Sequence, residues 1–562
     1  MHRFLLFALV FGLPPVRADA ANKPVAITQA QPIEKLDSDG HPSAVTAGTV
    51  GATYTLVKQD GDQVILRDAS GTEYEIAIAA TDYTPPPAAP SAPPAAAPAS
   101  PPATNTATAS TTTNAAPSAA STAVTSDSPP PWAMKPPGPA TTPSPLTSTS
   151  TAAGPALSKD DADKLDKLND ALGIPLLTGT PLWKEKVDDV ASRLNWPQES
   201  KTDTEESFRR YANAGEALVF GTSAYSLALY GKNGKPTYFS LVFANEGDFA
   251  EVKQVHDSRD GSAIDAALGH LADAVKSDGK TITDALSAIL GEPTLAMFGN
   301  SSSNRDEMHR WDWNGAAFLL NTHQGQFCSL KIVPSGVADN FGTVDVTDRD
   351  ELRDLLAKRV VKRDNGDVIV SELPMVDQGP KGYCVPATWE RYLRYMDLPA
   401  DLYVLAMVGH SGLGGGTDTS TMNVGIDDYV TAYHRRLELY GDPVDAEHVA
   451  RYIDQGLPLA WACFVSQPVE DLTNAETADR KSVTDWADYK NKLDVKDRAL
   501  GDTFLAHHPG EENGHMRLII GYNKQTNEIA ISDSWGEQMA ERWVYSPTAQ
   551  RITQNAVYYL SW

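Results

Sequence analysis

Short runs of alternating hydrophobic and polar residues lie near the start of the chain. Three of them cover residues 54–57, 64–66 and 74–78, and the turn sequences DGD and ASG separate them. A period of two is typical of strands that bury one face. We predict a small β-barrel of the Src-homology type at residues 45–84. So small a module cannot hold the machinery of an enzyme, and we expect a binding or spacing role.

The periodicity stops at residues 85–157, which consist almost entirely of Ala, Pro, Ser and Thr. Such a segment cannot bury enough apolar surface to offset the entropy lost when its backbone is ordered. We predict a disordered linker, partly in polyproline conformation, that lets the flanking domains stand apart.

Helical spacing returns after the linker. Leu165, Leu168 and Leu172 share one face of a predicted helix. Ser158 can cap the start of this helix and Gly173 can end it.

Two hairpins follow in this middle region. One pair of alternating runs flanks the sequence GKNGK, and another flanks Asn314-Gly315, which is a strong hairpin signal. Helical patterns occupy about 183–194 and 283–290. We predict a separate α+β domain at residues 158–346, and its pattern contains no catalytic constellation.

The C-terminal region, residues 347–562, has a different order of elements. A charged helix at about 348–359 is followed by further helical patterns and then by a series of strands. Helices followed by an antiparallel β layer indicate an α+β unit. The whole chain is therefore predicted to be a multidomain α+β protein.

The first residues combine a basic start, an apolar run from Phe4 to Leu13 and an Ala18-Asp19-Ala20 step. This pattern resembles a signal peptide over residues 1–20. The run is too short to span a bilayer comfortably, and no later stretch approaches the roughly 20 apolar residues that a span needs. We expect an exported protein, periplasmic, extracellular or on the cell surface, with no integral membrane segment after signal removal.

The net charge of −26 limits the partners of the chain. Nucleic-acid binding relies on basic residues that displace counterions from phosphates, so a nucleic-acid partner is not expected. The pattern carries no signal for the oligomeric state.

The chain has three cysteines. Cys328 and Cys463 lie in apolar runs that predict buried strands, so packing is their expected role, with a bridge between them left open. Cys384 instead precedes a helical pattern, and Pro386 is tolerated only in a first turn. Cys384 is thus predicted at a helix N-terminus, where the dipole stabilises a thiolate by about 1 kcal/mol.

A nucleophilic thiol also needs a base that shares its proton. His515 stands at the start of an apolar strand pattern, and Asp533 stands at the end of the next one. Strands joined by a short turn are antiparallel neighbours, so we expect His515 and Asp533 to meet. Gln378, six residues before Cys384, is a candidate donor to an oxyanion together with the Cys384 backbone N–H.

The sequences QGPKGYC, GHMRLIIGY and SDSWG, in this order, resemble the papain-like cysteine peptidase superfamily. Within it they are similar to the bacterial double-glycine, bacteriocin-processing peptidases. The resemblance implies Cys384 as nucleophile, His515 as acid and base, Asp533 as its orienting group and Gln378 as oxyanion donor. It also implies that Trp535 shields the His–Asp pair from water. Peptides or proteins would be the substrates, and no cofactor or metal is implied.

The resemblance is incomplete at two places. Tyr383 and Val385 flank the nucleophile where plant and lysosomal relatives have Cys-Gly-Ser-Cys-Trp, and Asp533 replaces their Asn. No transporter segment is present, so the leader-peptide substrate of the double-glycine branch does not carry over. Residues 410–422 are either a substrate-side loop or a flexible connection to a helix capped at Thr419 or Ser420.

Three functions fit these residues. The leading hypothesis is an exported cysteine peptidase. The alternatives are a cysteine acyltransferase, for example of the transglutaminase-like kind, and an inactive peptidase-like domain that serves as a binding protein. The middle domain is predicted to be an extra recognition domain or an inhibitory pro-region. His507 and His508 suggest a solvated loop rather than a metal site, because no ligands at a recognisable spacing complete one.

Overall fold

A computed structural model describes the N-terminal strands at 24–26, 32–36, 42–47, 53–60, 63–67 and 73–77, residue 81, and most of 158–562. Within the last range it leaves out 256–260, 301–304, 324, 380–381, 410, 412–416, 418 and 501–513. The chain divides into two units, Met1–Ala119 and Ala120–Trp562. The predicted signal peptide (1–20) and linker (85–157) lie outside the described residues and stay predictions.

The N-terminal unit is an antiparallel sheet with the order β1-β4-β5-β6-β2-β3. Its strands are β1 (Pro24–Ala26), β2 (Pro32–Leu36), β3 (Pro42–Ala47), β4 (Thr53–Asp60), β5 (Gln63–Arg67) and β6 (Glu73–Ala77). The last three cover the predicted strands at 54–57 and 64–66 and residues 74–77 of the one predicted at 74–78. The first three begin before residue 45 and each starts with proline, a residue that a strand tolerates at its first position. Closure of this sheet into a small barrel stays a prediction.

The middle domain is built on an antiparallel sheet with the order β13-β14-β15-β16-β12-β11-β8-β7. Its strands are β7 (Gln198–Lys201), β8 (Glu205–Tyr211), β11 (Ser226–Lys232), β12 (Lys235–Asn245), β13 (Thr294–Phe298), β14 (Asp306–Trp313), β15 (Ala316–His323) and β16 (Phe327–Pro334). A small separate pair consists of β9 (Leu218–Val219) and β10 (Thr222–Ser223). The helices are α1 (Lys159–Leu172), α2 (Val187–Leu194), α3 (Ala250–Val255), α4 (Gly261–Leu290) and α5 (Ser335–Asp339), with a 3-10 turn at Leu182–Lys184.

The local signals of the middle domain are found where they were expected. Ser158 caps α1, and Gly173 ends it with a φ of 68°. Asn314 and Gly315 both have positive φ in the turn between β14 and β15, as a tight hairpin turn requires. The second helical pattern is shorter than predicted, because the residues up to Lys184 form the 3-10 turn before α2.

The predicted start of the helix at 283–290 is wrong. Helix α4 ends at Leu290 but begins at Gly261. Two interior glycines, Gly269 and Gly279, and several Ser and Asp residues weaken its helical pattern. Packing explains one of these glycines: a Cβ at Gly279 would lie 2.4 Å from the Thr322 side chain on β15. The glycine that lowers helix propensity therefore allows the helix to lie close to the sheet.

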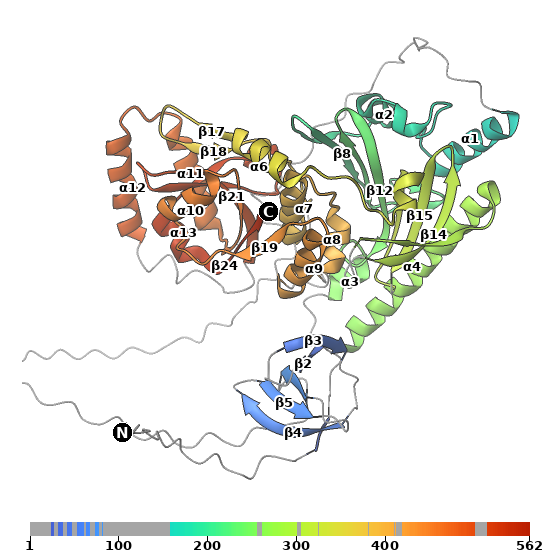
Figure 1. The fold of residues 1–562 in the computed structure, drawn as a ribbon, viewed down its shortest axis with the longest axis horizontal. Coiled ribbons are helices and arrows are strands. Elements are labelled where there is room, and N and C mark those ends of the chain that lie inside the picture. The colour runs from blue at the N-terminus through green and yellow to red at the C-terminus, as the bar shows by residue number, and fades with distance from the viewer. Residues whose placement is uncertain are drawn as a thin grey trace, which may run out of the picture. The chain divides into compact units, whose positions relative to one another are not determined.

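The C-terminal domain combines a branched antiparallel sheet with helices on its faces (Figure 1). The strands are β17 (Val360–Lys362), β18 (Val368–Val370), β19 (Arg436–Leu439), β20 (Leu459–Phe464), β21 (Gly514–Asn523), β22 (Glu528–Ser532), β23 (Arg542–Tyr545) and β24 (Thr553–Ser561). The helices are α6 (Arg349–Lys358), α7 (Cys384–Tyr395), α8 (Leu402–Val408), α9 (Thr419–Thr431), α10 (Ala446–Ile453), α11 (Gln467–Arg480), α12 (Trp486–Leu500) and α13 (Ser546–Ile552), with a 3-10 turn at Glu537–Met539.

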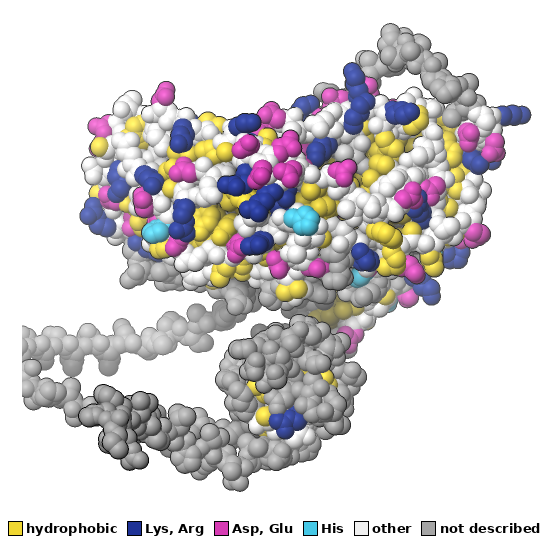
Figure 2. Space-filling view, in the orientation of Figure 1, with side chains coloured by type: hydrophobic (Ala, Val, Ile, Leu, Met, Phe, Trp, Pro, Cys, Tyr) yellow, Lys and Arg dark blue, Asp and Glu magenta, His cyan; other side chains and the backbone are white. Residues whose placement is uncertain are grey.

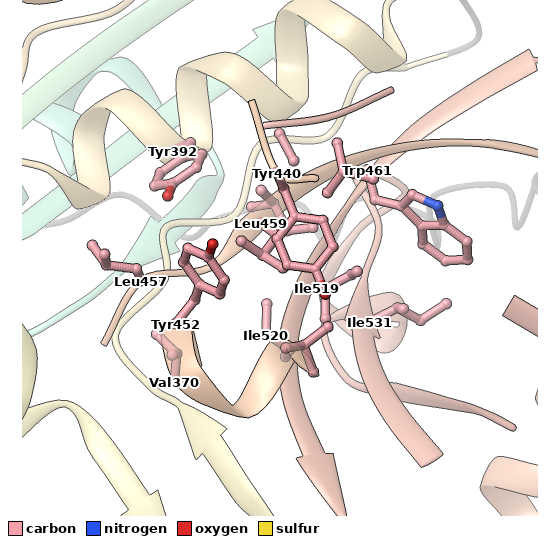
Figure 3. Close-up of a cluster of buried hydrophobic side chains, with 14 of the residues drawn as sticks. Val370, Tyr392, Tyr440, Tyr452, Leu457, Leu459, Trp461, Ile519, Ile520 and Ile531 are labelled. Carbon is pink, nitrogen blue, oxygen red and sulfur yellow. The ribbon is translucent and has the colours of Figure 1, made fainter. Parts of the chain in front are cut away.

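The core of this domain lies between α7 and strands β20, β21 and β22. Figure 3 shows part of it, including Tyr392 of α7 and Leu459 and Trp461 of β20. The Tyr392 hydroxyl donates to the Pro458 carbonyl at 2.5 Å, which fixes the helix against the start of β20.

Helix α7 is buried on all sides, although it contains charged residues. Together with α8 and α9 it lies between the C-terminal sheet and the middle-domain sheet (Figure 1). Glu390 on α7 is fully buried and pairs with Arg209 of β8 at 3.3 Å. Arg394 pairs with Glu205 of β8 at 3.2 Å. Because an unpaired charge is strongly unfavourable inside a protein, the middle domain completes the environment of this helix.

Backbone contacts also join the two domains. Tyr211 of β8 donates to the Asp377 carbonyl at 2.6 Å, and Glu372 accepts from the Asp203 backbone at 2.7 Å. The segment that leads into α7 is therefore held by the middle domain.

No helix in the part of the chain that the structure describes is long and apolar enough to cross a membrane. On the face shown in Figure 2, basic and acidic side chains are interspersed over both domains, and no extended basic patch is seen.

Candidate active site

Cys384 is the first residue of α7, as predicted, and Pro386 lies in the first turn. The thiol is 9 % exposed. The groups that act on the sulfur are the His515 imidazole and the backbone N–H groups of Met516 and Val385. Burial raises the pKa of the thiol, but the His515 contacts and these N–H groups outweigh it, so the pKa of Cys384 lies below its usual value.

His515 is the second residue of β21 and is 6 % exposed. Its Nε2 lies 2.8 Å from Oδ1 of Asp533. An imidazole has two ring nitrogens, so Nδ1 is left to serve the thiol. Burial lowers the pKa of His515, but the interactions with Asp533 and Cys384 raise it by more. The pKa of His515 therefore lies above its usual value. Thiolate and imidazolium therefore stabilise each other.

Strand pairing explains why His515 and Asp533 meet. Leu518 of β21 lies opposite Ser532, the last residue of β22. Because the strands are antiparallel, the residue after β22 reaches the start of β21. The predicted proximity of the two side chains is thus found in the structure.

Asp533 lies in a buried charge cluster, which we define as Asp533, Arg517, Arg542 and Glu470. Arg517 of β21 lies 3.1 Å from Asp533 and 2.8 Å from Glu470. Arg542 of β23 contacts the same two carboxylates, Glu470 at 2.5 Å. Burial raises the pKa of Asp533, but the two guanidinium groups and His515 lower it far below its usual range. The carboxylate that orients the imidazole therefore stays charged.

Sequence reasoning found His515 as a partner of Asp533 but did not find Arg517, Arg542 or Glu470 of the charge cluster. Arg517 offered a signal, since it is a charged residue inside the apolar run HMRLII. Glu470 on α11 offered none, because a carboxylate on a helix usually faces solvent.

Trp535 covers the imidazole. Its ring stacks on His515 with the centroids 4.4 Å apart and an interplanar angle of 22°. The Arg517 and Arg542 guanidinium groups lie 5.8 and 5.6 Å from the same indole ring. A ring held in this way can exclude water from the His515–Asp533 pair.

Gln378 is held next to this pair through Ser534. Its backbone N–H donates to the Ser534 carbonyl at 2.9 Å, and the Ser534 hydroxyl donates to its side-chain Oε1 at 2.8 Å. The hydroxyl thereby fixes which end of the amide accepts. The Nε2 end, the donor that an oxyanion would need, is turned away from Ser534.

Tyr383, which precedes Cys384, extends into the middle domain. Its hydroxyl accepts from the Gly247 backbone N–H, and its ring packs edge-on against Tyr403 of α8 at 5.8 Å. Tyr383 therefore has a structural role. It anchors the chain next to Cys384 to the loop after β12.

We expect Gly247→Ala to disturb Cys384 from the other domain. A Cβ at Gly247 would lie 1.8 Å from the Tyr383 hydroxyl oxygen, so the tyrosine must move. The measurement is the alkylation rate of Cys384 by iodoacetamide, which should change severalfold. Gly269→Ala is the matched control, since nothing lies within 4 Å of a Cβ there. Equal rates in both variants and the wild type would show that the two domains are not coupled at this contact.

The pH dependence of alkylation tests the thiolate directly. Because the pKa of Cys384 is lowered, its reaction should reach half its maximum at a lower pH than that of a free thiol. His515→Ala removes the main cause of the lowering, so the midpoint should shift upward. Cys463 is a control within the chain: burial raises its pKa to about 12, and it should stay unreactive at neutral pH. An unchanged midpoint in His515→Ala would contradict the ion pair.

The other predicted features have mixed outcomes. All three cysteines are free, so Cys328 and Cys463 do not form a bridge. Helix α9 begins at Thr419, while most of 410–418 and both His507 and His508 lie outside the described residues. In the segments that are described, no group of three His, Cys, Asp or Glu residues could hold a metal ion.

Comparison with known proteins finds one family match. Residues 370–560 match the Peptidase_C39 like family. The match confirms the predicted resemblance for the C-terminal region and supports a cysteine peptidase in general terms, with proteins or peptides as substrates. The chain has no significant match among curated proteins or among solved structures.

Proposed function

We propose that the C-terminal domain hydrolyses peptide bonds with Cys384 as nucleophile. The observation that supports this most directly is the pairing of His515 Nε2 with Asp533 at 2.8 Å, together with the lowering of the Cys384 pKa by the same imidazole. An inactive binding protein would have no need for a polarised thiol in this arrangement.

The proposed reaction has two steps. The Cys384 thiolate attacks the peptide carbonyl carbon, and the His515 imidazolium gives its proton to the leaving amine, which leaves a thioester. His515 then takes a proton from water, whose oxygen attacks the thioester and releases the carboxylic acid, and Cys384 returns to the thiolate beside the imidazolium. The Cys384 backbone N–H and the Gln378 side-chain amide are the proposed donors to the oxyanion in both steps.

A mixed peptide library tests this proposal. We expect new peptide termini after incubation with the full chain, identified by mass spectrometry, and none with heat-inactivated protein. Identical peptide profiles in the two samples would contradict peptide hydrolysis.

A primary amine in excess separates hydrolysis from acyl transfer. A peptidase should release free carboxylic acids even when the amine is present. If the amine is incorporated in place of water in most products, the acyltransferase alternative is correct instead.

We also propose that the protein is exported and works outside the cytoplasm. The support is the N-terminal sequence, with its basic start and short apolar run. N-terminal sequencing of the protein recovered outside the cytoplasm should begin after Ala20, and an intact Met1 in all of it would contradict signal removal.

A further inference from the structure

A cavity of about 310 Å³ lies between the middle-domain sheet and the helices α7, α8 and α9. Its volume is that of a small-molecule site. Neither Cys384, His515 nor Asp533 lines it, so it is separate from the candidate active site.

The walls of the cavity are mainly apolar, and tyrosine rings form much of them. Tyr230 and Tyr238 stack on each other with their centroids 4.2 Å apart. The Tyr230 hydroxyl accepts from Arg209 at 2.7 Å, and the Tyr238 hydroxyl donates to the Ala400 carbonyl at 2.5 Å. Tyr429 of α9 likewise donates to the Pro399 carbonyl. With their hydroxyl groups engaged by the protein, these rings offer apolar surface to the cavity.

Asp401 contributes an acceptor without a donor. It caps α8, and its Oδ1 accepts from the Tyr403 and Val404 backbone N–H groups at 3.0 and 3.1 Å. Its other oxygen, Oδ2, is buried and accepts no hydrogen bond from any residue that the structure describes. Asp401 is 4 % exposed and lines the cavity. A buried carboxylate oxygen without a donor is unfavourable unless a ligand or water completes it.

Lys331 contributes the opposite charge. It lies on β16, a central strand of the middle-domain sheet, and lines the same cavity. Its ammonium lies 5.6 Å from the centroid of the Phe298 ring. Burial lowers the pKa of Lys331, while Asp401 and Asp306 attract its charge from a distance. No carboxylate in the described part of the chain is within ion-pairing distance of it.

Of the other charged lining residues, Asp345 is exposed, and four form ion pairs with one another. Glu205 bonds Arg394, and Lys232 bonds Asp397. Among the described lining residues that are not exposed, half-buried Lys331 and the Asp401 Oδ2 therefore remain as charged groups without an ion-pair partner that could contact a bound molecule. They differ in sign, and apolar surface surrounds them.

We propose that this cavity binds a zwitterionic α-amino acid or short peptide with an apolar side chain. The ligand carboxylate pairs with Lys331, its ammonium bonds Asp401 Oδ2, and its side chain packs among the tyrosine rings. The site does not depend on the proposed peptide hydrolysis. It does adjoin the nucleophile's helix, since Leu393 and Arg394 of α7 also line it.

Calorimetric titration of the full chain with L-phenylalanine and with the dipeptide Leu-Phe tests this site. The protein carries Cys384→Ala, so that the dipeptide is not consumed. We expect saturable binding of at least one zwitterion. N-acetylphenylalanine lacks the ammonium and phenylalaninamide lacks the carboxylate, and each should bind at least about tenfold more weakly than the zwitterion, because each loses one charged contact. The absence of saturable binding for both zwitterions would overturn the proposal.

Two variants assign the charged contacts. Lys331→Met should weaken binding of the zwitterion at least about tenfold. It should leave the binding of phenylalaninamide unchanged, because this ligand has no carboxylate to pair with Lys331. Asp401→Asn keeps the α8 cap, since Asn caps a helix as well as Asp, and should weaken the zwitterion but not N-acetylphenylalanine. Lys235→Met, at an exposed position of β12, is the control. If both site variants bind the zwitterion as the wild type does, the proposal is wrong. The comparison of ligand analogues on the wild type decides the question even where a variant does not fold.

Discussion

Replacing Cys384 by alanine is expected to lower peptide hydrolysis about a millionfold, the loss seen when the nucleophile of a serine peptidase is removed. The side chain that forms the covalent bond is absent in this variant. The neighbouring groups His515, Asp533 and Gln378 would remain, so only weak residual catalysis by electrostatic stabilisation is expected. The loss is measured as the turnover of a peptide that the wild type cleaves. The enzyme concentration must be high enough to detect the residual activity of the variant.

Cys463→Ala is the matched control for this experiment. Cys463 lies on β20 directly opposite His515 and is fully buried, but burial raises its pKa to about 12. Its removal leaves a small cavity and should lower stability slightly, with turnover within severalfold of the wild type. If Cys384→Ala retains wild-type turnover, or if only Cys463→Ala abolishes it, the proposed nucleophile is wrong.

Replacing Glu470 by glutamine is expected to destabilise the C-terminal domain by about 3–5 kcal/mol, the usual effect of removing one partner from a buried ion pair. Glu470 is fully buried and contacts Arg517 at 2.8 Å and Arg542 at 2.5 Å. Burial raises its pKa, but the two guanidinium groups lower it more, so the carboxylate is charged in the folded protein. Without it, two buried cations share Asp533 alone. Thermal unfolding should show a lower transition temperature for this domain.

The same variant should also affect the imidazole. Arg517 lowers the pKa of His515, and Glu470 offsets part of the charge of Arg517. In Glu470→Gln the pKa of His515 should fall. The alkaline limb of the pH–rate profile, where the imidazolium loses its proton, should therefore move to lower pH.

Glu476→Gln provides a comparison on the same helix. Glu476 is 2 % exposed, and burial raises its pKa to about 8, so it is mostly uncharged at neutral pH. Glutamine resembles the protonated acid, and the loss of stability near pH 7 should stay within about 1 kcal/mol. Equal destabilisation by Glu470→Gln and Glu476→Gln would contradict the special role of the charge cluster.

The pH trend of Glu476→Gln has a definite sign. The folded pKa of about 8 exceeds the ordinary value of 4.5, so the folded state binds this proton more tightly than the unfolded state. The wild type therefore loses this contribution to stability as the pH rises through the window between the two values. Relative to the wild type, the variant should gain stability over the same window. The window runs from about pH 5 to about pH 8. If the difference in unfolding free energy between the variant and the wild type stays constant across it, the raised pKa is contradicted.

The sequence by itself determined those features that depend on neighbours along the chain. The caps of α1, the Asn314-Gly315 turn and the place of Cys384 at the start of α7 all follow from backbone preferences of single residues. The meeting of His515 and Asp533 was also predictable, because one short turn joins their strands and fixes their pairing. Motif order added the peptidase resemblance, which the family match confirms for residues 370–560.

Only the tertiary structure decided what surrounds these residues. Glu470 reaches the site from α11, Arg542 from β23, and Gly247 touches Tyr383 from another domain. Helix α4 continues through Gly279 although glycine has a low helix propensity. A glycine is needed there because Thr322 of the sheet leaves no room for a Cβ. Local preferences amount to less than about 1 kcal/mol per residue, whereas burying an unpaired charge or a clashing Cβ changes the free energy by several times as much. Long-range packing therefore decided which charges stand beside the thiol and its imidazole.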